Sequence, residues 1–351
     1  TPEFTGLVID ALARDPDLMS LSGQALIGAE LGHRYAIVDL DGSANSTTVS
    51  QRQRMLVQLT ATLTQLPSVF AVQIKIDGVP QNITNLPYQV SLANNPDPIV
   101  LTADGFRQLS INATPMTRAS EAAKAWRAYE FAINNQQTLL ALLGPQGVGL
   151  SRLVGGKSET VTIDSRPDLL APVIDPQGYI WTLGSLSASE LAAHDSSGNQ
   201  RFATLGWLGQ AEHLGFSISR EGSRIAFLLG YPGSARIYVS AIVRDENGAP
   251  IALSTPIRLG LAERPAGSVA FIDETTVATI ARLDSGLTYP LYLKIGGQPK
   301  RLAPVADARA TVSNGSAAPA YALDSNQELS LLRSLTWIKI AKDILAIHFS
   351  G

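Results

Sequence analysis

The sequence predicts a mainly β protein in which a small α/β domain precedes a β-propeller of about five to six blades. One observation is the period-2 alternation of apolar residues in the C-terminal two thirds of the chain, and a second is the recurrence of one strand-and-turn pattern there. The third is the alternation of helical and strand patterns in the first 80 residues. With 351 residues, 45% apolar and 16% charged, the chain can form two globular domains.

The segment from Phe216 to Val243 shows the pattern most clearly. Two turns, with glycines at 222 and 233, separate three apolar strands, and hairpin turns favour glycine where the backbone needs a positive φ. In the third strand Ile237, Val239 and Ala241 alternate with Tyr238, Ser240 and Ile242. Such a meander cannot bury its apolar faces alone, so we expect it to repeat.

The same strand and turn recur along the rest of the chain. The turn residues are separated by 41 to 54 positions, close to the length of one four-stranded propeller blade, whereas a β-sandwich explains the strands but not the spacing. Because each turn residue caps its own turn, we expect these residues to serve the fold rather than a reaction. They are Asn134, Asp175, Ser219 with Gly222, Asp273 and Asp324.

The N-terminal part reads as helix, strand, helix, strand. The pattern predicts helices over 5–13 and 49–66 and strands over 35–40 and 69–76, which indicates an α/β domain over 1–88. Residues 89–118 are rich in Asn, Pro and Thr and are predicted as a linker with one hairpin around Asp104-Gly105, ahead of a propeller over 119–351. The helical pattern at 117–129 fits either a connecting helix or the start of the first blade.

Several stretches together resemble a known family. RYAIVDLDG at 34–42 and the segment 54–81 are similar to the GerMN domain of spore-germination and envelope proteins. RPDLLAPVIDPQGYIWTL at 166–183, GFSISREGSRIAFL at 215–228 and the end of the chain from Trp337 resemble the propeller of the actinobacterial lipoprotein LpqB family. The order of the two modules is the LpqB arrangement, and the resemblance covers most of 33–82 and 130–351.

The resemblance implies a location and a partner. LpqB proteins are exported, acylated on an N-terminal Cys and anchored to the outer face of the cytoplasmic membrane. They are associated with the extracytoplasmic domain of the MtrB sensor histidine kinase and tune phosphorylation of the MtrA regulator. This sequence departs from that pattern because it contains no Cys and begins at a helix where the family has further strands, so we expect a truncated chain without its lipid anchor. The family offers no catalytic motif to transfer.

Composition narrows the function further. A net charge of −3 and the lack of a basic cluster argue against a nucleic-acid partner. No apolar run has the length of a transmembrane helix. Four histidines lack metal-type spacing, and His213 is expected at a turn or blade edge. We therefore expect no catalytic residue, metal or cofactor, with a cation held by the turn acids around the channel as a weaker alternative.

Two aromatic residues stand out as candidate contacts. Trp207 is bracketed by glycines and Tyr231 begins a Tyr-Pro-Gly turn, so both are predicted at exposed loops where an aromatic side chain can anchor a partner. The leading hypothesis is a non-enzymatic lipoprotein that binds and modulates a membrane sensor kinase. A module that binds cell-wall glycan or peptide is the alternative, and a propeller enzyme such as a lactonase or lyase is the third.

Overall fold

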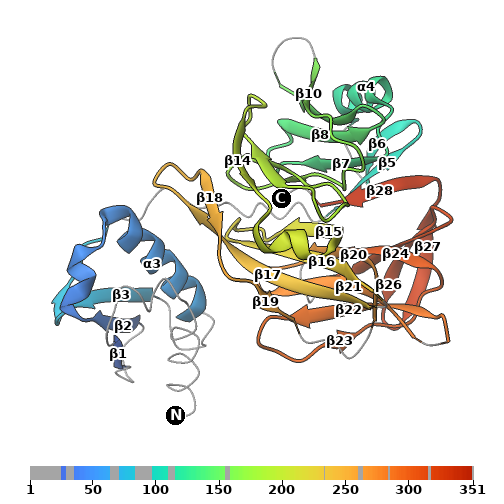
Figure 1. Cartoon of the computed structure of the whole chain (residues 1–351). Helices are drawn as coiled ribbons and strands as arrows, with labels where there is room; N and C mark the ends of the chain where they lie inside the picture. Colours follow the sequence, from blue (N-terminus) through green and yellow to red (C-terminus); the bar gives the residue numbers. More distant parts are fainter. Residues whose placement is uncertain are drawn as a thin grey trace. The chain divides into compact units, whose positions relative to one another are not determined.

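A computed structural model describes the chain over residues 25–28, 35–63, 71–83, 97–109, 115–154, 159–232, 234–259, 264–283, 285–314 and 318–349 (Figure 1). The chain divides into two compact units, Thr1–Ser91 and Leu92–Gly351. The helix expected over 5–13, together with His33 and Gly233, lies outside the described residues.

In its described residues, the first unit is a four-stranded sheet covered by one α-helix. Its strands are β1 (Ala25–Gly28), β2 (Tyr35–Leu40), β3 (Ala71–Ile76) and β4 (Val79–Pro80), in that order across the sheet. β2 and β3 pair in parallel, which requires a crossover, and η1 (Gly42–Ser46) and α3 (Val49–Leu63) supply it. Leu59 and Leu63 of the helix pack against Ile74 and Ile76 of the sheet. The predicted strand, helix and strand are present.

The second unit contains five successive antiparallel meanders among the described residues. Each runs in chain order across its own sheet, as hairpin connections dictate. The first two are β7 (Glu130–Ile133), β8 (Leu139–Gly144), β9 (Gly147–Arg152) and β10 (Thr160–Asp164), then β11 (Val173–Ile174), β12 (Ile180–Thr182), β13 (Leu191–His194) and β14 (Gln200–Thr204).

The third sheet follows a short 3-10 helix and carries one additional strand. It contains β15 (Glu212–Ile218), β16 (Arg224–Tyr231), β17 (Ser234–Arg244) and β18 (Pro250–Leu253), with β19 (Ile257–Arg258) also paired to β17 and with η2 (Gly206–Gln210) before it. The last two are β20 (Arg264–Phe271), β21 (Thr276–Arg282), β22 (Thr288–Lys294) and β23 (Lys300–Arg301), then β24 (Ala308–Ser313), β25 (Ala320–Asp324), β26 (Leu329–Arg333) and β27 (Thr336–Ala341).

A sixth sheet is built from the two ends of the unit. The last strand, β28 (Ile344–His348), pairs with β5 (Ile99–Thr102), which forms a hairpin with β6 (Gly105–Gln108). The predicted hairpin around Asp104-Gly105 is therefore present, but it belongs to the propeller rather than to a linker. Its strand pattern is local, whereas its pairing partner lies at the far end of the chain, which explains why the sequence alone suggests a linker.

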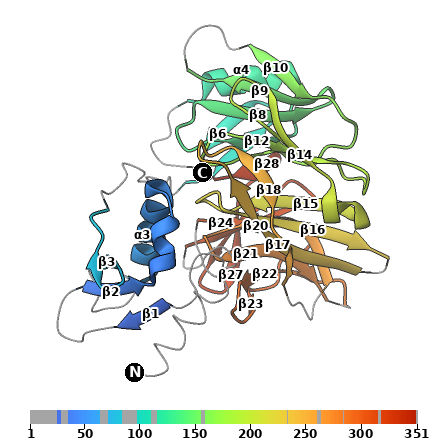
Figure 2. The same ribbon diagram turned by 60° about the vertical axis from the view of Figure 1, so that its left-hand side comes forward.

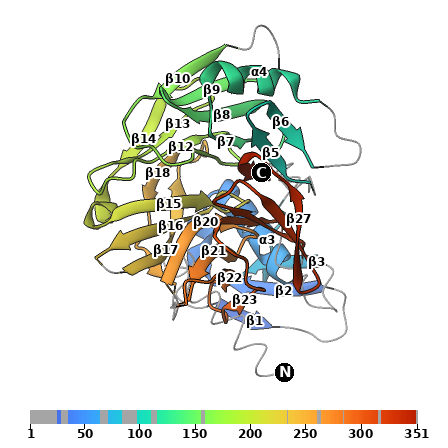
Figure 3. The same cartoon turned by 90° about the vertical axis from the view of Figure 1, so that its right-hand side faces the viewer.

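The six sheets form a closed ring. β7, β11, β15, β20 and β24 each open their sheet and contact the next one in turn, and β28 contacts β7 on one side and β25 on the other. Figure 1 labels the red β28 beside the teal β5 and β6, and Figure 3 shows the green, yellow and orange sheets that follow. The predicted propeller is confirmed, with six blades in the described part of the chain.

The fifth repeat is displaced by one strand from its expected phase. Asp175, Ser219 and Asp273 lie between the first and second strands of their blades, whereas Asp324 ends β25, the second strand, and begins the turn to β26, the third. The strand expected to open this blade is in fact its second, because β24 precedes it. A strand-and-turn pattern of this kind specifies a hairpin but not which hairpin of the blade.

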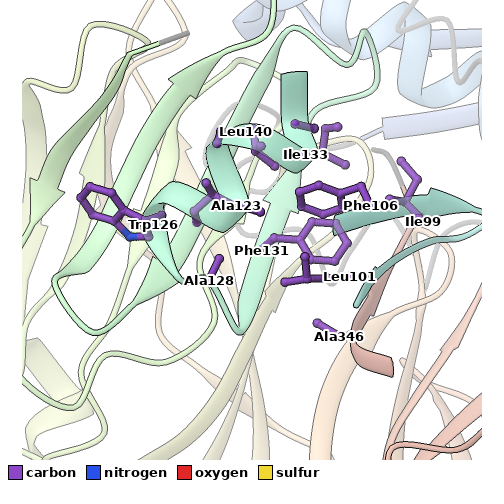
Figure 4. Close-up of a cluster of buried hydrophobic side chains, with 13 residues drawn as sticks. Ile99, Leu101, Phe106, Ala123, Trp126, Ala128, Phe131, Ile133, Leu140 and Ala346 are labelled. Carbon is purple, nitrogen blue, oxygen red and sulfur yellow. The ribbon is translucent and has the colours of Figure 1, made fainter. Parts of the chain in front are cut away.

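Helix α4 (Thr117–Trp126) resolves the open alternative for 117–129 as a helix ahead of the first blade. It contacts β6 and β8, next to which Figure 2 shows it. A buried cluster lies beneath it (Figure 4), where the rings of Phe106 and Phe131 meet edge to face at 4.8 Å. We call the sixth sheet (β28, β5 and β6) the closing sheet. Apolar packing against α4 and β7 stabilises it in addition to the pairing of β28 with β5.

Candidate functional site

The structure places the two predicted contact residues on the same face of the β15–β18 blade. Trp207 lies in η2, and its ring centroid is 5.4 Å from that of Phe227 and 5.9 Å from that of Tyr238. Its side chain is half-buried, and so is that of Tyr231, which ends strand β16 (Arg224–Tyr231), so the expectation of exposed loop residues is wrong for both. The glycines that flank it allow a tight 3-10 turn that folds the ring back onto the sheet, with Gly206 at φ 45°.

His213 and Leu208 hold η2 in position. Leu208 is 1% exposed and packs in the core between the β11–β14 and β15–β18 blades. The two ring nitrogens of His213 lie 2.8 Å from the Gly184 carbonyl oxygen and 3.2 Å from the Leu208 carbonyl oxygen. His213 is therefore fully buried in β15 rather than at a turn or blade edge. A neutral imidazole has one N–H, so it donates to one of these oxygens, and the Leu208 carbonyl also accepts from the Ala211 amide at 3.3 Å.

Tyr231 lies at the end of β16 beside two residues of β17. The guanidinium carbon of Arg236 is 4.6 Å from the centre of the Tyr231 ring, a cation–π contact, and the hydroxyl groups of Tyr231 and Tyr238 share a hydrogen bond. Arg236 and Tyr238 are two positions apart in a strand and so project from the same face. Ile237 and Val239 project from the other face into the core shared with the next blade, as the alternation predicts.

Arg258 joins the group from a distant part of the chain. β19 pairs with β17 so that Arg258 lies directly opposite Tyr238, and residues opposite each other in an antiparallel pair share a face. We call Trp207, Tyr231, Arg236, Tyr238 and Arg258 the aromatic–arginine cluster. Sequence reasoning missed three of its members. The alternation along β17 could have indicated Arg236 and Tyr238, but no local signal indicates Arg258.

The cluster is electrostatically positive. The hydrogen bond from Tyr231, followed by the hydrogen bond and charge of Arg236 and the charge of Arg258, lowers the pKa of Tyr238. Burial, followed by the interaction with Tyr238, raises the pKa of Tyr231. Within the described residues no carboxylate forms an ion pair with either arginine, and Arg258 is exposed.

This arrangement suits the binding of anionic groups. A guanidinium presents several N–H donors in a planar fork that matches a carboxylate or a phosphate, and two such groups flank the tyrosine rings. The Trp207 Nε1 atom is buried and has no hydrogen-bond partner among the described residues. The cluster therefore combines aromatic area with charge, the composition that protein interfaces favour at their centres.

Comparisons with known proteins identify the family. Residues 119–344 match the model described as "Lipoprotein LpqB beta-propeller domain", and residues 8–82 match the model described as "Sporulation and spore germination". The chain belongs to the LpqB β-propeller family. The first match covers well over half of the chain, and the resemblance noted in the sequence is confirmed in both modules.

Solved structures and a curated protein give weaker likenesses. A nidogen/laminin complex has a TM-score of 0.46 at 14% identity over 67% of this chain and 88% of that one. A putative TolB from Agrobacterium tumefaciens has a TM-score of 0.45 at 13% identity, over 73% of this chain and 90% of that one. The mouse (Mus musculus) dehydrogenase/reductase SDR family member 1 is 43% identical over 42 residues, or 12% of this chain and 13% of that protein. These likenesses do not bear on the function of the LpqB-family chain.

The predicted turn residues bond within their own turns. Asp175 Oδ1 accepts from the Tyr179 amide at 2.9 Å, and Ser219 Oγ accepts from the Arg224 amide at 3.0 Å. Asp273 and Asp324 likewise accept backbone N–H groups, and Gly222 has a φ of 75°. Within the residues that the structure describes, no three His, Asp or Glu side chains are grouped to hold a metal ion.

Asp175 has an additional role that sequence reasoning did not identify. Its Oδ2 atom lies 2.7 Å from Arg244 Nη2 and accepts from Trp181 Nε1 at 2.8 Å. The Asp175 side chain is fully buried and the Arg244 side chain is 9% exposed, so the ion pair ties the β11–β14 blade to the β15–β18 blade. Arg244 is on the same blade as the aromatic–arginine cluster, so the pair fixes how that blade sits against its neighbour.

None of the helices that the structure describes combines the length and the apolar character of a membrane-crossing helix.

Proposed function

We propose that this LpqB-family chain is a non-enzymatic, envelope-associated lipoprotein module. In this proposal it lies outside the cytoplasm, anchored to the outer face of the membrane, and it binds the extracytoplasmic domain of an MtrB-type sensor histidine kinase. The contact surface is the aromatic–arginine cluster. Binding would modulate the kinase through protein–protein contacts rather than through a reaction.

The observation that carries the proposal is the pair of arginines beside half-buried aromatic rings. Arg236 and Arg258 have no acidic partner among the described residues, although they lie on one face with Tyr238 between them. Arginines without an ion pair among the described residues favour an acidic partner and speed its approach. The aromatic rings add apolar area that is already ordered before binding, which lowers the entropy cost of association. Family membership supports the envelope setting.

The test is a binding titration of the whole chain against the purified extracytoplasmic domain of the cognate kinase. We expect saturable binding that an Arg236→Glu/Arg258→Glu variant weakens by about tenfold or more, because like charges then face the acidic surface. Arg282→Glu/Arg107→Glu is the matched control, since it makes the same charge change at exposed positions of other blades. Raising the ionic strength should weaken the wild-type complex and the control alike.

Three results would separate the alternatives. Equal weakening by the control and the cluster variant would mean that net charge, not this surface, governs binding. Binding that neither variant affects would move the interface to another face. Absence of kinase binding together with retention on isolated cell wall, competed by soluble wall fragments, would favour the glycan- or peptide-binding alternative.

A further inference from the structure

A pocket of about 250 Å³ lies where the two ends of the propeller meet. Residues of the β5–β6 hairpin, of the end of α4 and of β28 line it. Its apolar lining includes Leu101, Ala123 and Leu345, and Figure 4 shows Leu101 and Ala123 in the cluster beneath α4. The pocket is remote from the aromatic–arginine cluster in the sequence and is not used by the proposed function.

Two cations stand at the edge of this apolar pocket. Lys124 and Arg127 both line it and are exposed, and neither side chain forms an ion pair or hydrogen bond with a described residue. Arg127 caps α4 with a φ of 55°, a left-handed conformation that glycine usually takes at this position. The helix therefore ends with an arginine beside the pocket where a neutral glycine is the common choice.

The size and lining of the pocket indicate one class of ligand. A volume of about 250 Å³ corresponds to roughly eight water molecules, and so to a molecule of about eight non-hydrogen atoms. The apolar part of this mixed lining favours a short aliphatic chain, and two cations at the edge that form no ion pair with a described residue favour an anionic head group. We propose that the pocket binds a small carboxylate with a short aliphatic chain, with the chain against Leu101 and Leu345 and the carboxylate between Lys124 and Arg127.

Such a ligand would strengthen the closure of the ring. It would contact the first hairpin of the propeller and its last strand at the same time, since Leu101 belongs to β5 and Leu345 to β28. A ligand that binds only the folded state raises the apparent melting temperature by mass action. The pocket therefore predicts a thermal shift as well as binding.

The experiment uses hexanoate, which has eight non-hydrogen atoms, as the probe for the whole chain. Ligand-observed NMR measures its dissociation constant, with 1-hexanol as the uncharged analogue and hexylamine as the cationic one. Lys124→Ala/Arg127→Ala should weaken hexanoate binding by about tenfold, since each exposed ion pair contributes modestly. Arg107→Ala is the matched control, because Arg107 is exposed on β6 and does not line the pocket.

A second variant tests the pocket without changing the charge. Ala103 is exposed in the β5–β6 turn and lines the pocket, so Ala103→Phe should fill its mouth and abolish both hexanoate binding and the thermal shift. Basic residues in the last turn of a helix also stabilise its dipole. If Lys124 and Arg127 only stabilised the helix dipole, the double variant would be less stable than the wild type. Hexanoate would then show no saturable binding to the wild type or to any variant.

Several outcomes would overturn the proposal. They are equal binding of hexanoate and hexylamine, unchanged hexanoate affinity in either variant, or no saturable binding over the millimolar range. Because the aromatic–arginine cluster is untouched in all of these proteins, kinase binding should remain as in the wild type, and the two proposals fail or hold separately.

Discussion

The buried cluster beneath α4 and the aromatic–arginine cluster both bring together aromatic residues from distant parts of the chain, yet their surroundings differ. In the buried cluster Phe106 of β6 and Phe131 of β7 are 5% and 3% exposed and pack among apolar side chains, with the His348 ring 5.9 Å from that of Phe131. In the cluster Trp207, Tyr231 and Tyr238 are half-buried and lie beside arginines. Rings covered on all sides stabilise the fold, whereas rings left partly open beside unpaired charge are available to a partner.

The two regions also differ in how they hold ionisable groups. Near the closing sheet, burial raises the pKa of Glu130 from 4.5 to about 7, against the lowering effect of Arg309, and burial lowers the pKa of His348 from 6.5 to about 4. Both groups are therefore favoured in their neutral forms by the folded state. In the cluster the charged arginines remain accessible to solvent. The contributions of Glu130 and His348 to stability should therefore depend on pH, whereas partner binding by the aromatic–arginine cluster should depend on salt.

The largest effect is expected for Phe131→Ala. Removing a ring that is 3% exposed should lower the free energy of unfolding by about 3–5 kcal/mol, because the transfer energy is lost and a cavity remains. Urea unfolding of the whole chain measures the loss, and Phe131→Leu, which keeps most of the volume, should cost clearly less. If alanine cost no more than leucine, the buried cluster beneath α4 would not belong to the cooperative core.

Glu130→Gln should remove a pH-dependent contribution of about 3 kcal/mol to the free energy of unfolding. Because the folded-state pKa of Glu130 is raised from 4.5 to about 7, its contribution is fully present below pH 4.5 and is lost as the pH rises to about 7. Relative to the glutamine variant, the wild type should therefore lose stability on going from pH 4.5 to 7. Parallel stability profiles for the two proteins over this range would show that Glu130 is solvated.

His348→Phe should remove a pH dependence of the free energy of unfolding that is similar in size and opposite in direction. With a folded-state pKa lowered from 6.5 to about 4, His348 contributes stability above pH 6.5 that is lost as the pH falls to about 4. Phenylalanine keeps the edge contact with the Phe131 ring, whose centroid is 5.9 Å away. In the wild type the two groups offset each other between pH 4.5 and 6.5, so each single variant should show a slope that the double variant lacks.

In the aromatic–arginine cluster, Trp207→Ala should lower the free energy of unfolding by about 2 kcal/mol. This loss is smaller than that for Phe131→Ala because Trp207 is only half-buried. Thermal and urea unfolding give this value. Trp207→Phe is the control that retains contact with Phe227. A loss equal to that of Phe131→Ala would show that Trp207 belongs to the core and would leave only the other cluster members as contact residues.

The smallest effect on stability is expected for Arg236→Ala/Arg258→Ala. Changes at solvent-accessible positions without an ion pair usually lie within about 0.5 kcal/mol, so unfolding should be nearly unchanged while kinase binding weakens. The comparison between the two regions fails if this variant unfolds as readily as Phe131→Ala.

The sequence by itself determined the local elements of this protein. The alternation of Tyr238 with Ile237 and Val239 predicted both faces of β17, and the helical pattern over 49–66 predicted α3, because side-chain periodicity is set by backbone geometry within one element. The turns at Asp175 and Ser219 could be predicted for the same reason, since each side chain accepts a hydrogen bond from a backbone amide of its own turn.

Only the tertiary structure decided which elements meet. The pairing of β28 with β5, the displaced phase of Asp324 and the position of Arg258 opposite Tyr238 all depend on contacts between distant segments. The burial of Trp207 depends on the packing of η2 against the Phe227 ring in β16. No local pattern encodes these contacts, because they arise only when the ring closes and the blades bury their apolar faces against one another.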